Sequence, residues 1–158
     1  MNDAQIMERI KTLLGERVGE IVNPSPRRIF LNVEYPNLTA ALAVLKDSLG
    51  FTYLATITGL DLGESFEILY HLANEYTNLN VRTQIPKASP HLPSVCGVIP
   101  GAILYERELQ DMFGIVVDGI PDPRRLVLPD DWPDGQYPLR KDWTFTRPEE
   151  KIPGGKTS

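Results

Sequence analysis

The chain has 158 residues, of which 42% are hydrophobic and 23% charged, and its formal net charge is -5 at pH 7. This length and composition predict one globular domain with a real core, whereas the acidic balance argues against nucleic acid, whose phosphates need clustered Lys and Arg. The single cysteine, Cys96, excludes an internal disulfide and any iron-sulfur cluster held by several thiolates of this chain.

The opening residues MNDAQIMERI lack the basic start and the apolar run of a secretory signal. No stretch of the chain approaches about 18 uninterrupted apolar residues. We therefore expect a chain that is cytosolic or peripheral to a membrane.

The first half of the chain predicts a helix, a strand and a second helix. Apolar residues recur at helical spacing from Ile6 to Leu14, and Gly15 follows as a stop signal. Residues 28–34 alternate between apolar and polar, which is the period of a strand with one face in the core. Leucines three or four positions apart over residues 38–49 then return to a helical stripe.

Three further strands are predicted over residues 52–58, 66–72 and 79–85. The links between them are short, which favours antiparallel pairing with helices on one face. A third helix is expected from Pro100 to Gly114, and residues 115–117 add a short strand. The predicted fold is therefore α+β: a two-layer sandwich with a mainly antiparallel four-stranded sheet, helices on one face and a long irregular C-terminal arm.

The predicted domain division is a core over residues 1–118 and an extended, proline-rich docking arm over residues 119–158. The arm holds seven of the fourteen prolines and both tryptophans. Prolines prevent a regular helix or a central strand, yet leaving several aromatic side chains in water would cost roughly 2 to 3 kcal/mol each. The arm must therefore lie along a surface, either that of its own domain or that of a partner protein.

The charges of YERELQDMFGI, residues 105–115, could serve catalysis, solvation or docking. Glu106 and Glu108 are two positions apart, roughly 200 degrees around a helix, so they cannot converge on one substrate atom. Arg107 and Asp111 are four positions apart and can pair. A solvated helix face and a protein interface remain as alternatives.

No residue pattern predicts a catalytic, cofactor-binding or metal site. CxxC, HExxH, GxGxxG and GxxxxGK motifs are missing from the sequence. His71 is expected at an exposed or rim position of its strand, and His91 lies in a proline-rich turn. Cys96 has no paired thiol, which favours a small buried hydrophobe.

The helix YERELQDMFGI followed by GIPDPRRLVLPDDWPDGQYPLRKDW resembles the C-subunit family of complex I, the NADH-quinone oxidoreductase. That family has counterparts in membrane-bound energy-converting nickel-iron hydrogenases and formate hydrogenlyase. The resemblance is dense over residues 100–143 and looser over residues 1–99. Ile120 and Tyr137 stand where many respiratory members have histidine, and LPDDWP followed by YPLRKD looks more like the hydrogenase branch.

The resemblance implies a noncatalytic peripheral-arm subunit of a membrane-bound, ion-translocating redox complex, at the cytoplasmic face of the membrane. Its expected partners are a large catalytic subunit and an iron-sulfur small subunit. Iron-sulfur clusters and a nickel-iron centre or quinone would belong to those partners, and this chain would hold no cofactor and be no enzyme alone. The C subunit of an NADH-quinone oxidoreductase and a general adaptor outside redox metabolism remain alternatives.

The residues expected to contact the partner are Glu106, Arg107, Glu108, Asp111, Arg124, Arg125, Trp132, Tyr137, Arg140, Lys141 and Trp143.

Overall fold

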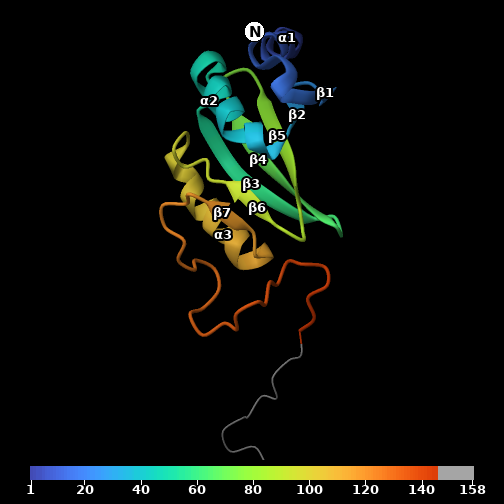
Figure 1. Ribbon diagram of the computed structural model, residues 1–158. Helices are drawn as coiled ribbons and strands as arrows, with labels where there is room; N and C mark the ends of the chain where they lie inside the picture. The colour runs from blue at the N-terminus through green and yellow to red at the C-terminus, as the bar shows by residue number, and fades with distance from the viewer. Residues whose placement is uncertain (146–158) are drawn as a thin grey trace, which may run out of the picture.

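A five-stranded sheet, a two-stranded sheet and three α-helices make up the computed structural model, which describes residues 1–145 (Figure 1). The helices are α1 (Asp3–Leu14), α2 (Leu38–Leu49) and α3 (Ile103–Phe113). The strands are β1 (Val18–Ser25), β2 (Arg28–Val33), β3 (Tyr53–Asp61), β4 (Ser65–Ala73), β5 (Asn78–Pro86), β6 (His91–Pro93) and β7 (Val116–Asp118). Short 3-10 turns are η1 (Gly15–Arg17), η2 (Tyr35–Asn37) and η3 (Pro100–Ala102).

The helix ends follow from local chemistry. Asn2 and Gln5 form a capping box at the start of α1, in which each side chain accepts a hydrogen bond from the other residue's backbone N–H. Gly50 ends α2 with φ 71°, and Gly114 ends α3 with φ 68°, a left-handed conformation that is easiest for glycine. The three predicted helices are confirmed.

The large sheet of the structure is mainly antiparallel, but it has five strands where four were predicted, and it includes one parallel pair. Its strand order is β1-β2-β5-β4-β3, and β2 runs parallel to β5 whereas the other neighbouring pairs are antiparallel. The missed strand, β1, buries almost none of its residues and contains Pro24, so no alternation marks it in the sequence. The parallel pair arises because β3 and β4 lie between β2 and β5 in the chain but beyond β5 in the sheet.

The core lies between one face of the large sheet and the helices (Figure 1). Alternate residues of β2, β4 and β5 are enclosed there, and Ile6 and Ile10 of α1 and Leu42 and Leu45 of α2 pack in the same cluster at 0% exposure. Each such aliphatic side chain contributes about 1.5 to 3 kcal/mol when fully buried. This cluster therefore fixes the helices on the sheet.

The structure does not show the predicted long C-terminal arm. Residues 119–145, called here the C-terminal segment, form no helix or strand but turn back toward α3 and the end of the sheet (Figure 1). For example, the Leu139 N–H donates to the Met112 carbonyl at 3.0 Å. The prolines of this segment prevent the repeated backbone hydrogen bonds of a helix or a sheet, but single hydrogen bonds to α3 still hold its backbone. Residues 146–158, the rest of the predicted arm, lie outside the described residues.

Candidate functional site

Helix α3 is fixed on the end of the large sheet by a close approach at Gly59. A Cβ at Gly59 would lie 2.6 Å from Cε2 of Phe113, so only glycine admits this ring. Phe113 also packs edge-on against Phe66, with 5.6 Å between ring centroids. The helix thus has a defined position from which its charged residues reach outward.

Glu106 is fully enclosed and binds the loop that follows β6. Its carboxylate accepts hydrogen bonds from Ser94 Oγ at 2.7 Å, from the Val95 N–H at 2.6 Å and from the Cys96 thiol at 3.1 Å. Burial, aided by this carboxylate, raises the pKa of the Cys96 thiol to about 11. Cys96 is buried as predicted, and its thiol acts as a donor to Glu106.

Arg107 binds the start of the C-terminal segment. Its Nε donates to the Arg124 carbonyl at 2.7 Å and its Nη2 to the Arg125 carbonyl at 2.8 Å. Its Nη1 lies 3.5 Å from the Asp122 carboxylate. The rigid guanidinium fork thus fixes two successive carbonyls and a nearby acid.

Asp111 binds the next part of the same segment. One carboxylate oxygen accepts from the backbone N–H groups of Leu126, Val127 and Leu128, at 2.9, 2.8 and 3.2 Å. The predicted pairing of Arg107 with Asp111 therefore does not form in the structure, because each side chain satisfies the irregular backbone instead. Such hydrogen bonds to a charged group are stronger than neutral ones.

Two arginines of the C-terminal segment bind backbone carbonyls, one within the segment and one at the end of α3. Arg125 Nη1 donates to the carbonyls of Pro129, Asp130 and Trp132 at 3.1, 3.2 and 2.7 Å. Arg140 Nε donates to the Phe113 carbonyl at 2.6 Å. Arginine's several donors suit it to backbone that has no ladder partner.

Tyr137 lies between the C-terminal segment and the end of α3. The Arg140 guanidinium stacks over its ring, 4.6 Å from the centroid. The ring also occupies the space that a Cβ at Gly114 would need. Glycine at position 114 therefore both ends the helix and admits the tyrosine.

Asp61, at the end of β3, joins the sheet to the end of the C-terminal segment. Its carboxylate accepts from Lys87 Nζ at 2.8 Å, from the Lys141 N–H at 2.9 Å and from the Gly63 N–H at 2.8 Å. Burial raises the pKa of this carboxyl, but these hydrogen bonds, led by that of Lys87, outweigh it and lower the pKa to about 2.

An aromatic cluster forms within the C-terminal segment. The rings of Trp132 and Trp143 lie 6.1 Å apart, and Trp143 stacks on Phe145 at 5.8 Å. Both indole N–H groups donate to Gln136, one to its carbonyl and one to its side-chain oxygen. The tryptophans are half-buried, whereas Phe145 is 60% exposed.

Several large apolar side chains of the C-terminal segment face solvent, and we call them the exposed apolar set. They are Leu126, Val127, Leu139 and Phe145, with exposed fractions between 43% and 60%. Asp111 binds the backbone N–H groups of Leu126 and Val127, and the Met112 carbonyl accepts from the Leu139 N–H, so α3 holds the backbone of these three residues.

The predicted partner-binding residues fall into three classes of exposure. Glu106 and Asp111 are buried; Arg107, Arg125, Trp132, Tyr137, Arg140 and Trp143 are half-buried; Glu108, Arg124 and Lys141 are exposed. Two residues of this region were missed, Asp61 and Lys87. Asp61 contacts Lys87, 26 residues away in the chain, and Lys141, 80 residues away. A pattern of neighbouring residues cannot predict such distant contacts.

In the described residues, the printed side-chain contacts of the two histidines are with residues outside α3. His71 is half-buried on β4, with Thr58 Oγ1 3.0 Å from its Nε2 and Asn80 Oδ1 2.6 Å from its Nδ1. His91 lies in β6 instead of a turn, and its Nδ1 is 3.1 Å from Asp118.

Within residues 1–145, no group of three or more His, Cys, Asp or Glu side chains is placed to hold a metal ion. None of the helices in the described part of the chain combines the length and the apolar composition needed to cross a bilayer.

Comparison with known proteins identifies relatives of two kinds. The chain is 38% identical over 141 residues to the C subunit of the NADH-quinone oxidoreductase of Chloroherpeton thalassium, covering 85% of this chain and 58% of that protein. It is 43% identical over 96 residues to formate hydrogenlyase subunit 5 of Escherichia coli K12, covering 57% of this chain but 17% of that much longer protein. The chain thus spans little more than half of the first relative.

A solved structure shares the fold. A chain of the membrane-bound sulfane sulfur reductase, an archaeal respiratory membrane complex, matches 89% of this chain and 85% of its own length with a TM-score of 0.80 at 28% identity.

The resemblance carried by YERELQDMFGI and the residues after it is confirmed by these relatives. The family model for the respiratory-chain NADH dehydrogenase 30 kDa subunit matches residues 24–149, from β1 through the C-terminal segment. The chain belongs to the respiratory-chain NADH dehydrogenase 30 kDa subunit family.

Proposed function

We propose that the chain is a noncatalytic docking subunit of a membrane-bound, ion-translocating redox complex, of the hydrogenase or formate hydrogenlyase type. The observation that carries this proposal is the exposed apolar set on a backbone already fixed by α3. A surface ordered before binding loses less conformational freedom on association. The same C-terminal segment carries Trp132, Trp143 and Arg125, residue types that are frequent at interface cores.

The internal contacts of α3 support docking over catalysis. The Glu106 side chain is hydrogen-bonded to the loop after β6. The side chains of Arg107 and Asp111 are hydrogen-bonded to the backbone of the C-terminal segment. Glu108 is exposed, and its nearest carboxylate neighbour on α3, Asp111 three residues later, is already bound to backbone amides of the C-terminal segment. In this proposal the charged helix orders the docking surface and leaves the redox chemistry to partner subunits.

The hydrogenase branch is favoured by one structural detail and by sequence identity. Tyr137 stands where many respiratory members have histidine, and its ring fills the space beside Gly114 under Arg140. Of the two relatives described above, formate hydrogenlyase subunit 5 shares the higher identity. The match to the C subunit of NADH-quinone oxidoreductase covers more of the chain, which supports that complex as the second candidate.

The proposed partners are a large catalytic subunit and an iron-sulfur small subunit, at the cytoplasmic face of the membrane. Iron-sulfur clusters, with a nickel-iron centre or a quinone site, would lie in those partners. Bound iron, nickel or flavin, or redox turnover, in the purified chain would contradict this assignment.

The docking proposal is tested by placing charge in the exposed apolar set. The double variant Leu126→Asp with Val127→Asp is expected to lower co-purification with the large subunit by about 30-fold or more, since interface hot spots contribute ~2 kcal/mol or more. A matched control is Leu13→Asp with Leu62→Asp, two exposed leucines on α1 and in the β3–β4 turn. Equal retention of both variants, with unchanged unfolding midpoints, would remove the basis of the proposal.

A further inference from the structure

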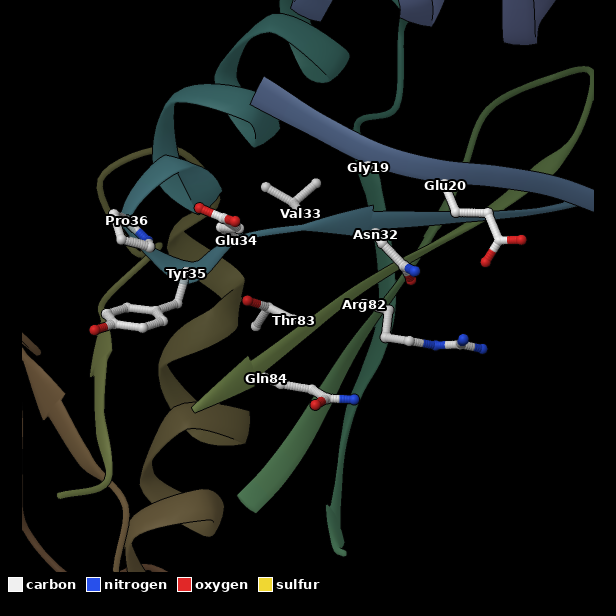
Figure 2. A pocket seen from close by; sticks show the side chains of 10 residues that line it. All are labelled: Gly19, Glu20, Asn32, Val33, Glu34, Tyr35, Pro36, Arg82, Thr83 and Gln84. Carbon is white, nitrogen blue, oxygen red and sulfur yellow. The ribbon is translucent and has the colours of Figure 1, made fainter. Parts of the chain in front are cut away.

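A cavity of about 700 Å³ lies among β1, the end of β2, η2 and β5 (Figure 2). None of the residues lining it belongs to α3 or to the C-terminal segment. The cavity exists because β5 extends further than β2, the strand that pairs with it in parallel. The last paired residues of β2 and β5 are Asn32 and Arg82, after which η2 carries the chain away while β5 continues to Pro86.

The Thr83 hydroxyl lines this cavity without a hydrogen-bond partner in the described part of the chain. The residue is 2% exposed, and its oxygen points toward the side where Tyr35 lies (Figure 2). Buried polar groups are nearly always paired, so this hydroxyl leaves hydrogen-bonding capacity for a group that occupies the cavity.

The charge of the lining favours a cation. Glu20 and Glu34 are exposed, and in residues 1–145 neither forms an ion pair. The cationic residue of the lining, Arg82, is offset by Glu67 at 3.4 Å and stacks over the Phe30 ring at 5.2 Å. Two carboxylates therefore remain uncompensated.

The cavity also offers neutral acceptors and an aromatic ring. The Gln84 side-chain N–H donates to Glu67 at 3.1 Å, which leaves its carbonyl oxygen as an acceptor. Glu34 and Tyr35 lie at one end of the cavity and Glu20 and Arg82 at the other (Figure 2). An elongated occupant with basic groups matches this arrangement.

We propose that the cavity receives a basic, extended segment of a neighbouring subunit of the same complex. A Lys or Arg of that segment pairs with Glu34, its aliphatic stem packs on the Tyr35 ring, and a polar group of the segment binds the Thr83 hydroxyl. The inference rests on the proposed assembly and adds a second contact, made by different elements. Exposed carboxylates bind a free small amine weakly, whereas a tethered segment gains from its high local concentration.

The test uses a photo-reactive residue in the full chain within the assembled complex. Tyr35→p-benzoylphenylalanine is expected to cross-link to one other subunit, at a peptide that contains Lys or Arg. Adding Glu20→Gln and Glu34→Gln should lower the yield by about fivefold, the effect of losing two exposed ion pairs. The same replacement at Tyr53, which is 65% exposed, is the control and should give no such product.

A second position separates this inference from the proposed function. Phe145→p-benzoylphenylalanine reports on the exposed apolar set. A cross-link from Phe145 but none from Tyr35 would overturn the inference and leave the docking role standing, whereas no cross-link from either would overturn both. A Tyr35 product with a second copy of this chain, with a segment that lacks basic residues, or with a yield unaffected by the glutamine substitutions would also overturn it.

Discussion

Asp61 is the residue through which acid should weaken the fold. The pKa of its carboxyl is about 2 in the folded chain, below its ordinary value of 3.8, so the ionised form stabilises the folded state. This contribution is fully present above about pH 4 and is lost as the pH falls through about 2. The loss releases both Lys87 and the Lys141 N–H.

We expect Asp61→Asn to lower the free energy of unfolding by about 1.5 to 3 kcal/mol at pH 6, since it removes hydrogen bonds to a charged acceptor. The difference from the unaltered chain should shrink as the pH approaches 2. Urea unfolding at pH 6, 4 and 2.5 measures it. Asp130→Asn, at an exposed position, is the control. A difference that stays constant over this range would show that Asp61 does not act through its charge.

Some of the residue-scale detail was readable from the sequence and some was not. The angular separation of Glu106 and Glu108 predicts that they cannot act together, and the structure places them on opposite sides of α3. Glu106 also stands four residues after Ala102 and three before Leu109, so helical spacing puts it on the buried side. The loop at Ser94 and Val95, which binds Glu106, has no sequence pattern that predicts this contact, because the contact depends on how the loop packs against α3.

Helix α3 and the C-terminal segment are joined through Asp111. Its carboxylate accepts hydrogen bonds from backbone N–H groups of a segment whose prolines prevent a regular helix or strand. Asp111→Ala is expected to raise amide hydrogen exchange at Leu126, Val127 and Leu128 by about 10-fold or more, since about 1.5 to 3 kcal/mol of pairing is lost. Exchange in β4 and β5 should stay unchanged.

Glu108→Ala, on the exposed side of the same helix, is the matched control for this exchange experiment. It changes the charge of α3 equally but touches no amide of the C-terminal segment in the structure. Equal exchange in both variants would show that Asp111 does not hold the segment.

The spacing of apolar residues predicted the helices and strands that bury one face. It failed for a strand that buries little of its surface. The three helices and the strands β2 to β5 follow from alternation or helical spacing, whereas β1 exposes most of its residues. The parallel pairing of β2 with β5 is set by how elements separated in the chain meet, which no local pattern encodes. The sequence left open whether the C-terminal segment lies on its own domain or on a partner, because contacts between distant residues carry no local pattern.

The molecule as a whole should tolerate loss of its C-terminal part. The buried hydrophobic residues of the described chain end at Val117, so deletion of residues 119–158 is expected to leave the sheet and helices folded but to abolish partner co-purification. Circular dichroism and urea unfolding of the truncated chain measure the first effect. An unfolded truncated chain would make the segment part of the core domain.

Family membership could be read from one charged helix and the motif after it, because those residues are contiguous. The docking surface itself stays a prediction; what the structure adds is that Arg107 and Asp111, two of the residues expected to contact a partner, bind their own chain. The cavity beside Thr83 could not be predicted, because its walls come from four elements between Gly19 and Gln84.

The parallel pairing of β2 with β5 has a consequence for biosynthesis. Arg28 pairs with Asn78, so a ribosome must translate α2, β3 and β4 before the partner of β2 exists. Until then the β1–β2 hairpin presents an open strand edge, which is the kind of edge that nascent chains use for aggregation or chaperone capture. Closure of the sheet is thus a late step, and translation stalled before Asn78 leaves that hairpin without its partner strand.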